Sequence, residues 1–226
     1  MKTVLTIWLA CILCANAQGQ DHSTESLQKF TRLKVYDRMN VTLIKGTENK
    51  ITVSGGDVSD LVIIEDNGQL KLRINREGLV STDMIDANLY YTEVLTLLDA
   101  NENGRIHSSE TITGTLLELK AQEAALIVLR LDVENVTVKS SAGSEIKLSG
   151  TALTQEVYVN TGAKAYNKEL STSETTVTVL AGGQAEVHGT EKVIARVKAG
   201  SSVTIYGSPK IVDKDNNFGG KIHEVH

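Results

Sequence analysis

The chain has 226 residues, with 23 Lys and Arg against 28 Asp and Glu, which gives a formal net charge of −5 at pH 7. This acidic balance argues against a nucleic-acid partner, because proteins that bind DNA or RNA need a basic surface. A single proline, 18 glycines and an aromatic content of 4%, in a chain rich in threonine and valine, indicate a sheet protein with tight corners.

The start of the chain predicts a secretory signal peptide over residues 1–17. Lys2 supplies a positive charge, residues 4–13 form an apolar run, and residues 15–17 offer small side chains at a cleavage site. The apolar run is shorter than the roughly eighteen residues that a membrane helix needs, and no later segment reaches that length. We therefore expect an exported protein without a transmembrane segment in the mature chain, located in the periplasm, at the cell surface or in the medium.

Cleavage after Ala17 would remove both cysteines, Cys11 and Cys14, together with one lysine. The mature chain would then carry 23 − 1 = 22 basic and 28 acidic residues, a net charge of −6. It would also need a core that is stable without disulfides. Neither cysteine follows the small aliphatic pattern of a lipoprotein signal, so lipid anchoring is the less favoured alternative. Residues 18–29 are expected to form a flexible N-terminal segment.

Residues 30–94 are expected to form strands of a less regular kind. Apolar and polar residues alternate in several short runs, and Asn67-Gly68 is a good hairpin turn between two of them. Antiparallel pairing is therefore expected here, and this part would cover the open end of the sheet system that follows. Residues 76–94 would form the join.

A short pattern, in which two apolar residues flank a variable one, recurs between residues 95 and 210. The copies begin at Leu95, Leu117, Val136, Val157, Val177 and Ala195. Their starts are 22, 19, 21, 20 and 18 residues apart, a mean of 20. Such self-similarity at a fixed period is typical of a solenoid.

Small residues and glycines mark a corner after each copy. The position four residues after each start holds Asp99, Ala121, Ser140, Thr161, Ala181 or Ala199. Glycines follow at Gly143, Gly162, Gly182, Gly183 and Gly200, where a positive φ is expected. Each unit is then strand, corner, strand, corner, and it can bury its apolar edge only by stacking on the next unit.

The sequence therefore predicts an all-β fold, a right-handed parallel β-helix or solenoid-like stack of rungs of about 20 residues, with a less regular β N-terminal part. A single domain is expected over residues 30–222, divided into 30–94 and the repeated rungs of 95–210. Residues 223–226 are expected to form a tail.

Residues 99–110, DANENGRIHSSE, match the calcium-loop pattern D-x-[DN]-x-[DN]-G-x5-E at every fixed position. The ligands would be Asp99, Asn101, Asn103 and Glu110. A calcium hand also needs a helix on each side of the loop, whereas both flanks here alternate like strands. We therefore expect no metal and no cofactor, with calcium binding by these four residues as the alternative.

No pattern in the chain predicts catalysis. His223 and His226 are three residues apart, whereas the zinc motif H-E-x-x-H separates its histidines by four on a helix. A polysaccharide-cleaving β-helix would bring carboxylates of adjacent rungs together to share acid and base duties. The positions one and three residues after the starts of the copies contain no such cluster of acids, so we name no catalytic or cofactor-binding residue.

Several short patterns together resemble a known family, the "putative auto-transporter adhesin" family with the head GIN domain. They are Phe30, Leu33 and Val35 in F-x-x-L-x-V, residues 41–46 in V-x-L-x-x-G, residues 67–70 in N-G-x-L, and residues 207–209 in G-x-P followed by 219–222. The resemblance covers about residues 30–222. It implies a secreted or surface-associated, β-helical, non-enzymatic protein of Gram-negative bacteria with a proposed role in adhesion, and it brings no catalytic or ligand residues.

We therefore expect a non-enzymatic, exported cell-envelope or surface protein that acts as an adhesin-like binding or structural module. Its partner would be a protein or a glycan at the cell envelope, and not nucleic acid. Two alternatives remain open at this point: a carbohydrate-active β-helix enzyme and a calcium-stabilised extracellular module.

Overall fold

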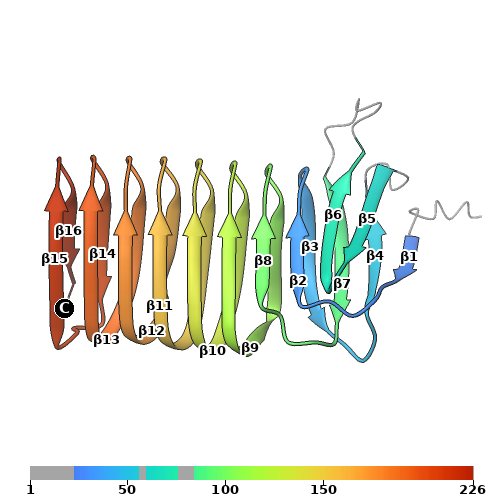
Figure 1. Cartoon of the computed structure of the whole chain (residues 1–226), viewed down its shortest axis with the longest axis horizontal. Coiled ribbons are helices and arrows are strands. Elements are labelled where there is room, and N and C mark those ends of the chain that lie inside the picture. The colour runs from blue at the N-terminus through green and yellow to red at the C-terminus, as the bar shows by residue number, and fades with distance from the viewer. Residues whose placement is uncertain (1–22, 56–59, 76–83, 226) are drawn as a thin grey trace, which may run out of the picture.

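The computed structural model describes residues 23–55, 60–75 and 84–225, and it confirms an all-β solenoid (Figure 1). The predicted signal peptide, residues 76–83 of the predicted join and His226 lie outside the described residues. The strands are β1 (Ser23–Ser26), β2 (Arg32–Val35), β3 (Met39–Lys45), β4 (Lys50–Ser54), β5 (Leu61–Asp66), β6 (Gln69–Ile74), β7 (Ile85–Tyr91), β8 (Leu97–Ala100), β9 (Arg105–Ala121), β10 (Leu126–Ser140), β11 (Glu145–Val159), β12 (Lys164–Val179), β13 (Gln184–Lys198), β14 (Ser202–Tyr206), β15 (Ile211–Asn217) and β16 (Lys221–Glu224). Within the described ranges, no helix is long and apolar enough to cross a membrane.

Long parallel strands make up the regular part of the stack. Each of β9 to β13 pairs in parallel with its neighbours, and partner residues such as Leu126 and Glu145 are 145 − 126 = 19 positions apart. Each long strand bends once, so that its two halves belong to two facing sheets. We call the sheet of β6, β2, β8, the second halves of β9 to β13 and β15 sheet A, and the sheet of β7, β3, the first halves of β9 to β13, β14 and β16 sheet B.

The core lies between the two sheets, where aligned inward side chains from successive rungs contact each other. One buried column of sheet A consists of Leu33, Leu98, Leu119, Val138, Val157, Val177 and Ala195. Alternate residues point outward, which is the period of two expected of strands. Every rung therefore covers the apolar surface of the next.

This register corrects the sequence alignment of the copies. Val157 pairs with Val138, and Val136 pairs with Gln155, so that the copies beginning at Val136 and Val157 are out of phase by two residues. The copy that begins at Leu95 is out of phase by one residue with the copy that begins at Leu117. Ladder partners of these rungs, such as Leu97 and Glu118, are 21 positions apart, whereas the two starts are 22 positions apart. A shift of two keeps the same residues on the same face, and only the hydrogen-bonded ladder distinguishes the two phases.

A two-residue turn connects sheet A to sheet B in every regular rung. Its two central residues both have positive φ, as in Ala142 (φ 52°) and Gly143 (φ 73°), and the Ser144 N–H donates to the Ser141 carbonyl at 3.2 Å. These are the features of a type I′ turn, which favours glycine because an L side chain is strained at positive φ. The same turn recurs at Asp37-Arg38, Glu102-Asn103, Glu123-Ala124, Thr161-Gly162, Ala181-Gly182, Ala199-Gly200 and Phe218-Gly219.

The predicted corner residues only partly coincide with these turns. Thr161, Ala181 and Ala199 are first central residues of turns, whereas Asp99, Ala121 and Ser140 lie on strands. The prediction of positive φ is confirmed for Gly143, Gly162, Gly182 and Gly200. It is wrong for Gly183, which follows the turn and donates its N–H to the Leu180 carbonyl at 3.1 Å.

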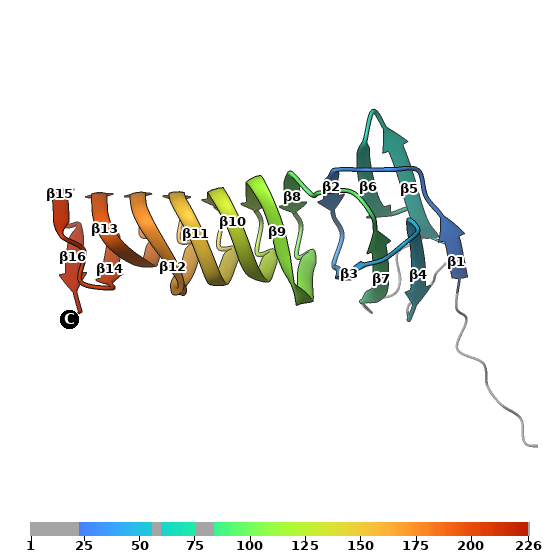
Figure 2. The same cartoon turned by 90° about the horizontal axis from the view of Figure 1, so that it is seen from below.

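The N-terminal part is stacked in an order that differs from the chain order. One rung consists of β2, the Asp37-Arg38 turn and β3. In this rung β2 pairs with β6 on one side and β8 on the other, and β3 pairs with β7 on one side and β9 on the other, always in parallel. The expected antiparallel pairing is confirmed for the β5–β6 hairpin at Asn67-Gly68 and for β4 with β7, but it does not extend to β2 and β3. Figure 2 shows these added strands at the N-terminal end of the stack.

The segment 18–29 is not simply a flexible leader to the domain. Ser23–Ser26 forms β1, which pairs antiparallel with β4, because the outer edge of β4 offers unpaired main-chain groups. Similarly, His223 and Glu224 do not belong to a free tail. They lie in β16, which pairs in parallel with β14.

Inward-pointing charges end the stack at its C-terminal side. Lys214 aligns with Ala195 and Glu224 with Ile205, so both occupy columns that are apolar in the preceding rungs. Their Nζ and Oε1 atoms lie 2.6 Å apart. The rung also carries Val212 and Ile222 at inward positions. Inward charges on a terminal strand disfavour edge-to-edge pairing with another sheet, which explains the ion pair between Lys214 and Glu224.

Gly150 and Gly143 provide a matched test of the strand ladder. Gly150 has φ +102°, and an added Cβ would stand 2.0 Å from the carbonyl oxygen of Leu131, its ladder partner, whereas a Cβ on Gly143 (φ +73°) would meet nothing within 4 Å. We expect Gly143→Ala to cost about 1–2 kcal/mol, the strain of left-handed backbone. Gly150→Ala should cost clearly more, because main chain must move. Urea unfolding of both variants measures the difference, and equal losses would contradict this account.

Replacing the terminal ion pair tests its capping role. We expect the Lys214→Val, Glu224→Val double variant to self-associate with rising concentration, because the apolar columns would then reach the open sheet edges. Size-exclusion chromatography with light scattering measures the mass. The control is Lys210→Val, Glu191→Val, which removes a surface ion pair of 2.7 Å. Association of both variants alike would show that hydrophobicity alone is responsible.

Candidate functional site

Two of the four predicted calcium ligands lie together at the end of β8. Asp99 is buried, its Oδ1 accepts a hydrogen bond from Asn101 Nδ2 at 2.9 Å, and its Oδ2 lies 3.5 Å from Lys34 Nζ. The Oδ1 of Asn101 in turn accepts from Gln122 Nε2 at 3.1 Å. These contacts already engage both carboxylate oxygens of Asp99 and the amide oxygen of Asn101.

The other two predicted ligands serve other parts of the rung. Asn103 is the second central residue of its turn, and its main-chain N–H donates to the Glu123 carbonyl at 2.9 Å. Glu110 Oε2 accepts from the Lys45 N–H at 3.0 Å. Glu110 lies five residues beyond Arg105 in a bulge of β9, because the ladder pairs His107 with Val128 and then Thr111 with Arg130. The turn therefore brings Asp99 and Asn101 together without Glu110. Among the described residues, no group of three or more His, Cys, Asp or Glu side chains could hold a metal ion.

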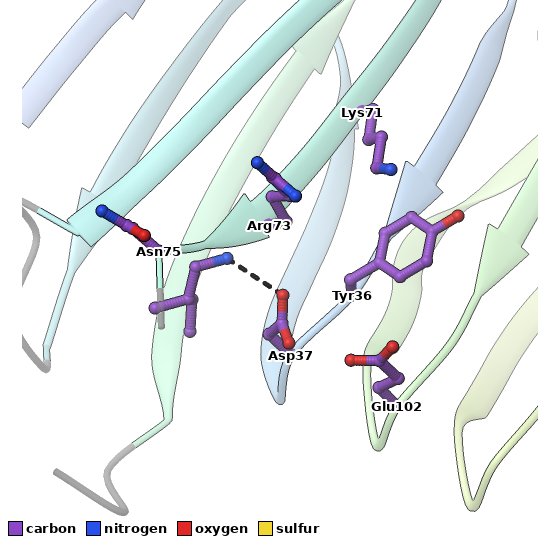
Figure 3. A pocket seen from close by; sticks show the side chains of 7 residues that line it. Tyr36, Asp37, Lys71, Arg73, Asn75 and Glu102 are labelled. Carbon is purple, nitrogen blue, oxygen red and sulfur yellow. Dashed lines mark hydrogen bonds between the residues drawn. The ribbon is translucent and has the colours of Figure 1, made fainter. Parts of the chain in front are cut away.

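The first hollow in the surface, which we call the turn pocket, has a volume of about 390 Å3 and lies where the ladder of turns begins (Figure 3). It is lined by Tyr36, Asp37, Lys71, Arg73, Ile74, Asn75 and Glu102. Val35 and Leu72 are the last register partners of β2 and β6. Beyond them the chain of β2 turns away at Asp37-Arg38 while β6 continues through Arg73 and Ile74, which opens the hollow between them.

The side chains of the turn pocket combine hydrogen-bond donors, acceptors and an aromatic ring. Lys71 Nζ lies 4.5 Å from the centre of the Tyr36 ring, and the Ile74 N–H donates to Asp37 Oδ2 at 3.2 Å. Burial, followed by the negative charges of Asp99, Glu102 and Asp37, raises the pKa of Tyr36. The positive charges of Lys71 and Arg73 balance the negative charges of Asp37 and Glu102 in this pocket. The pocket therefore suits a polar ligand without a large net charge.

The second hollow, which we call the sheet groove, has a volume of about 590 Å3 and lies on the outer face of sheet B. It is lined by Val128, Leu129, Glu145, Lys147, Leu148, Ser149, Tyr166, Lys168, Glu169 and Glu186. Val128, Lys147, Tyr166 and Glu186 are ladder partners on β10 to β13 and thus form one column along the solenoid axis.

A bulge in β12 forms one wall of the sheet groove. Asn167 pairs with Val187, but the next pair is Ser171 with His188, which leaves three extra residues on β12. Lys168 and Glu169 in this insertion are exposed, and the Lys168 carbonyl lies 3.1 Å from His188 Nδ1. Bulges of this kind redirect side chains and are common beside functional sites.

Charges of both signs alternate along the floor of the sheet groove. Glu145 lies 3.1 Å from Lys147 and 3.6 Å from Lys164, and Lys147 Nζ lies 5.8 Å from the centre of the Tyr166 ring. Glu169 and Glu186 add two carboxylates from neighbouring strands. The groove can therefore donate and accept hydrogen bonds beside a flat aromatic surface.

Neither hollow was predicted from the sequence. The columns searched for clustered acids lie on sheet A. In the sheet groove, Glu145 and Glu186 come from outward positions of sheet B that follow the turns, and Glu169 comes from the bulge of β12. The outward column of the groove lies nine positions after an inward column of sheet A. The pairs are Leu119 and Val128, Val138 and Lys147, Val157 and Tyr166, and Val177 and Glu186. The copies as aligned in the sequence begin at Leu117 and Val136, and the same offset from these starts gives Leu126 and Glu145, so the column could be found only once the ladder had fixed the phase.

A family model described as "Putative auto-transporter adhesin, head GIN domain" matches residues 29–209, which confirms the resemblance seen in the sequence. A "putative adhesin" of Bacteroides fragilis has a similar solved structure, with a TM-score of 0.82, 15% identity and coverage of 92% of this chain and 98% of that one. A "putative adhesin" of Parabacteroides merdae gives a TM-score of 0.67 at 16% identity, and a "putative lipid binding protein" of Parabacteroides distasonis gives 0.69 at 14%, both with coverage of 92% and 98%. At such identities the likeness shows the fold alone. No curated protein matches the chain.

Calcium titration of the Asp99→Asn variant tests the remaining site prediction. We expect the substitution to cost about 1–2 kcal/mol of unfolding free energy, because the partly buried ion pair with Lys34 is lost. Calcium should leave the Tm of both proteins unchanged, since Lys34 and Asn101 engage the carboxylate. Asp132→Asn, at an exposed residue that accepts a hydrogen bond from Thr151 at 3.0 Å, is the control. A calcium-dependent rise of Tm in the unsubstituted chain that Asp99→Asn abolishes would establish the site.

Proposed function

Because the chain belongs to the family described as "Putative auto-transporter adhesin, head GIN domain", we propose that it is an adhesin-like binding module of the cell surface or envelope that acts without catalysis. Its partner would be a glycan or a protein of that compartment. The predicted signal peptide of residues 1–17 supports export. The net acidic charge of the chain argues against nucleic acid as the partner.

The observation that carries the proposal is the position of the two hollows on a hydrogen-bonded ladder. The turn pocket takes its side chains from β6 and from two successive turns, and the sheet groove takes its side chains from four adjacent strands. The ladder fixes the spacing of these side chains before a ligand arrives. Such preorganisation lowers the entropic cost of binding and suits recognition.

A carbohydrate-active enzyme is the second candidate, because Glu145, Glu169 and Glu186 line one groove. Glycoside hydrolysis needs a pair of carboxyl groups in which one gives and one takes a proton. Glu145, however, is already engaged by two ammonium groups, those of Lys147 at 3.1 Å and Lys164 at 3.6 Å. We therefore place binding ahead of turnover.

Capture by the chain without its first 17 residues tests the proposed function. Labelled protein is applied to a glycan array and to intact envelopes of Gram-negative bacteria, and the Lys71→Gln, Arg73→Gln variant is the control for the turn pocket. We expect saturable binding without release of reducing sugar ends.

Two outcomes would contradict the proposal. Failure to bind any glycan, envelope or envelope protein would remove the binding function. Release of reducing ends that is lost in Glu169→Gln or Glu186→Gln would establish the enzymatic alternative instead.

A further inference from the structure

We propose that the sheet groove binds an extended, neutral polysaccharide whose chain runs along the solenoid axis. The inference rests on the proposed binding function and adds to it the ligand class, the position and the direction of the bound chain. Three features support the inference: the ladder register of the column, the surroundings of Tyr166 and the charges of the sheet groove.

The column of side chains in the groove repeats at the spacing of the strands. Val128, Lys147, Tyr166 and Glu186 are successive ladder partners, so their main-chain positions are separated by about 4.8 Å, the distance between neighbouring strands. One hexopyranose unit of an extended chain has nearly this length. A polysaccharide that lies along the column therefore presents about one sugar to each rung.

Tyr166 has the surroundings that a sugar ring requires. Its ring is partly exposed, and a flat aromatic face packs well against the apolar C–H face of a pyranose. Lys147 on one side donates hydrogen bonds, and Glu186 on the other side accepts them. Lys147 Nζ lies over the Tyr166 ring, 5.8 Å from its centre, so it is close enough to donate to a hydroxyl of a sugar that packs against the ring.

The charges of the groove select a neutral chain. Glu145, Glu169 and Glu186 carry three negative charges against the three positive charges of Lys147, Lys168 and Lys164, which lies 3.6 Å from Glu145, a net of −3 + 3 = 0. An anionic polymer would gain no net attraction here and would meet three carboxylates, since like charges repel. Hydroxyl groups, which both donate and accept, fit the mixed lining.

A peptide is a poorer occupant of this surface. An extended peptide binds a sheet by adding a strand at a free edge, where main-chain groups are unpaired. The floor of the groove is the face of β10 to β13, and each of these strands is paired on both sides. Only side chains are available for recognition there.

Substitution of Tyr166 tests the inference with cellohexaose as the neutral probe and oligogalacturonate as the anionic one. We expect the unsubstituted chain to bind cellohexaose more tightly than oligogalacturonate in isothermal titration calorimetry. Tyr166→Ala should weaken cellohexaose binding about tenfold, and Tyr166→Phe should retain most of it, because the ring remains. Glu186→Gln, which loses only charge, should weaken binding less than Tyr166→Ala.

The matched control is Tyr158→Ala. Tyr158 is an exposed tyrosine on the outer face of sheet A, and its hydroxyl contacts Glu156. Its removal should leave cellohexaose binding unchanged. Far-ultraviolet circular dichroism and the Tm of each variant show whether the fold is retained.

The direction of the bound chain is tested by oligomer length. Affinity for cello-oligosaccharides should rise with each sugar until the four rungs of the column are occupied and then level off.

The outcomes separate the inference from the proposed function. Envelope or glycan binding that survives Tyr166→Ala but is lost in Lys71→Gln, Arg73→Gln would overturn the inference and leave the proposed function intact. Preference for oligogalacturonate, or equal losses in Tyr158→Ala and Tyr166→Ala, would also overturn it. Failure to bind any ligand or envelope removes both.

Discussion

The stacked type I′ turns are the constraint on which the rest of the molecule depends. Each turn holds two residues at positive φ, and one of its N–H groups donates to a carbonyl of the next turn, as from Gly143 to Thr161 at 3.1 Å and from Gly162 to Ala181 at 3.0 Å. The turns are therefore part of the ladder and do not merely connect strands. They fix the register of both sheets, and with it the columns that build the core and the surface.

A buried polar network adds specificity to a core that is otherwise uniform along its axis. Apolar columns alone would tolerate a rung that slips against its neighbour, because valine, leucine and isoleucine are similar in shape. Asn167 donates to Gln155 at 2.8 Å, Gln155 to Thr175 at 3.2 Å, and Thr172 lies 2.6 Å from Thr175. A slip would leave these groups without partners in an apolar interior, at a cost of about 1–3 kcal/mol each. The network thus pins the rungs that carry the sheet groove.

Both hollows occur where the repeat is broken. The turn pocket lies where β6 runs past the first turn of the ladder, and the sheet groove lies beside the three extra residues of β12. A perfectly regular solenoid would have flat faces and no concave surface. The regular rungs supply rigidity and spacing, and the irregular ones supply shape, which is a common division of labour between scaffold and binding site.

The sequence alone determined that the chain is an all-β stack, because strand alternation and a recurrence of about 20 residues are both local patterns. It also determined most glycine turns and the family, since these depend on short motifs such as Asn67-Gly68. Only the tertiary structure decided the phase of the copies at Val136 and Val157, because a shift of two preserves every inward side chain. It alone placed β2 and β3 inside the stack and brought Glu145, Tyr166 and Glu186 into one groove. These outcomes depend on which strands are hydrogen-bonded, and pairing between distant segments leaves no mark in the local sequence.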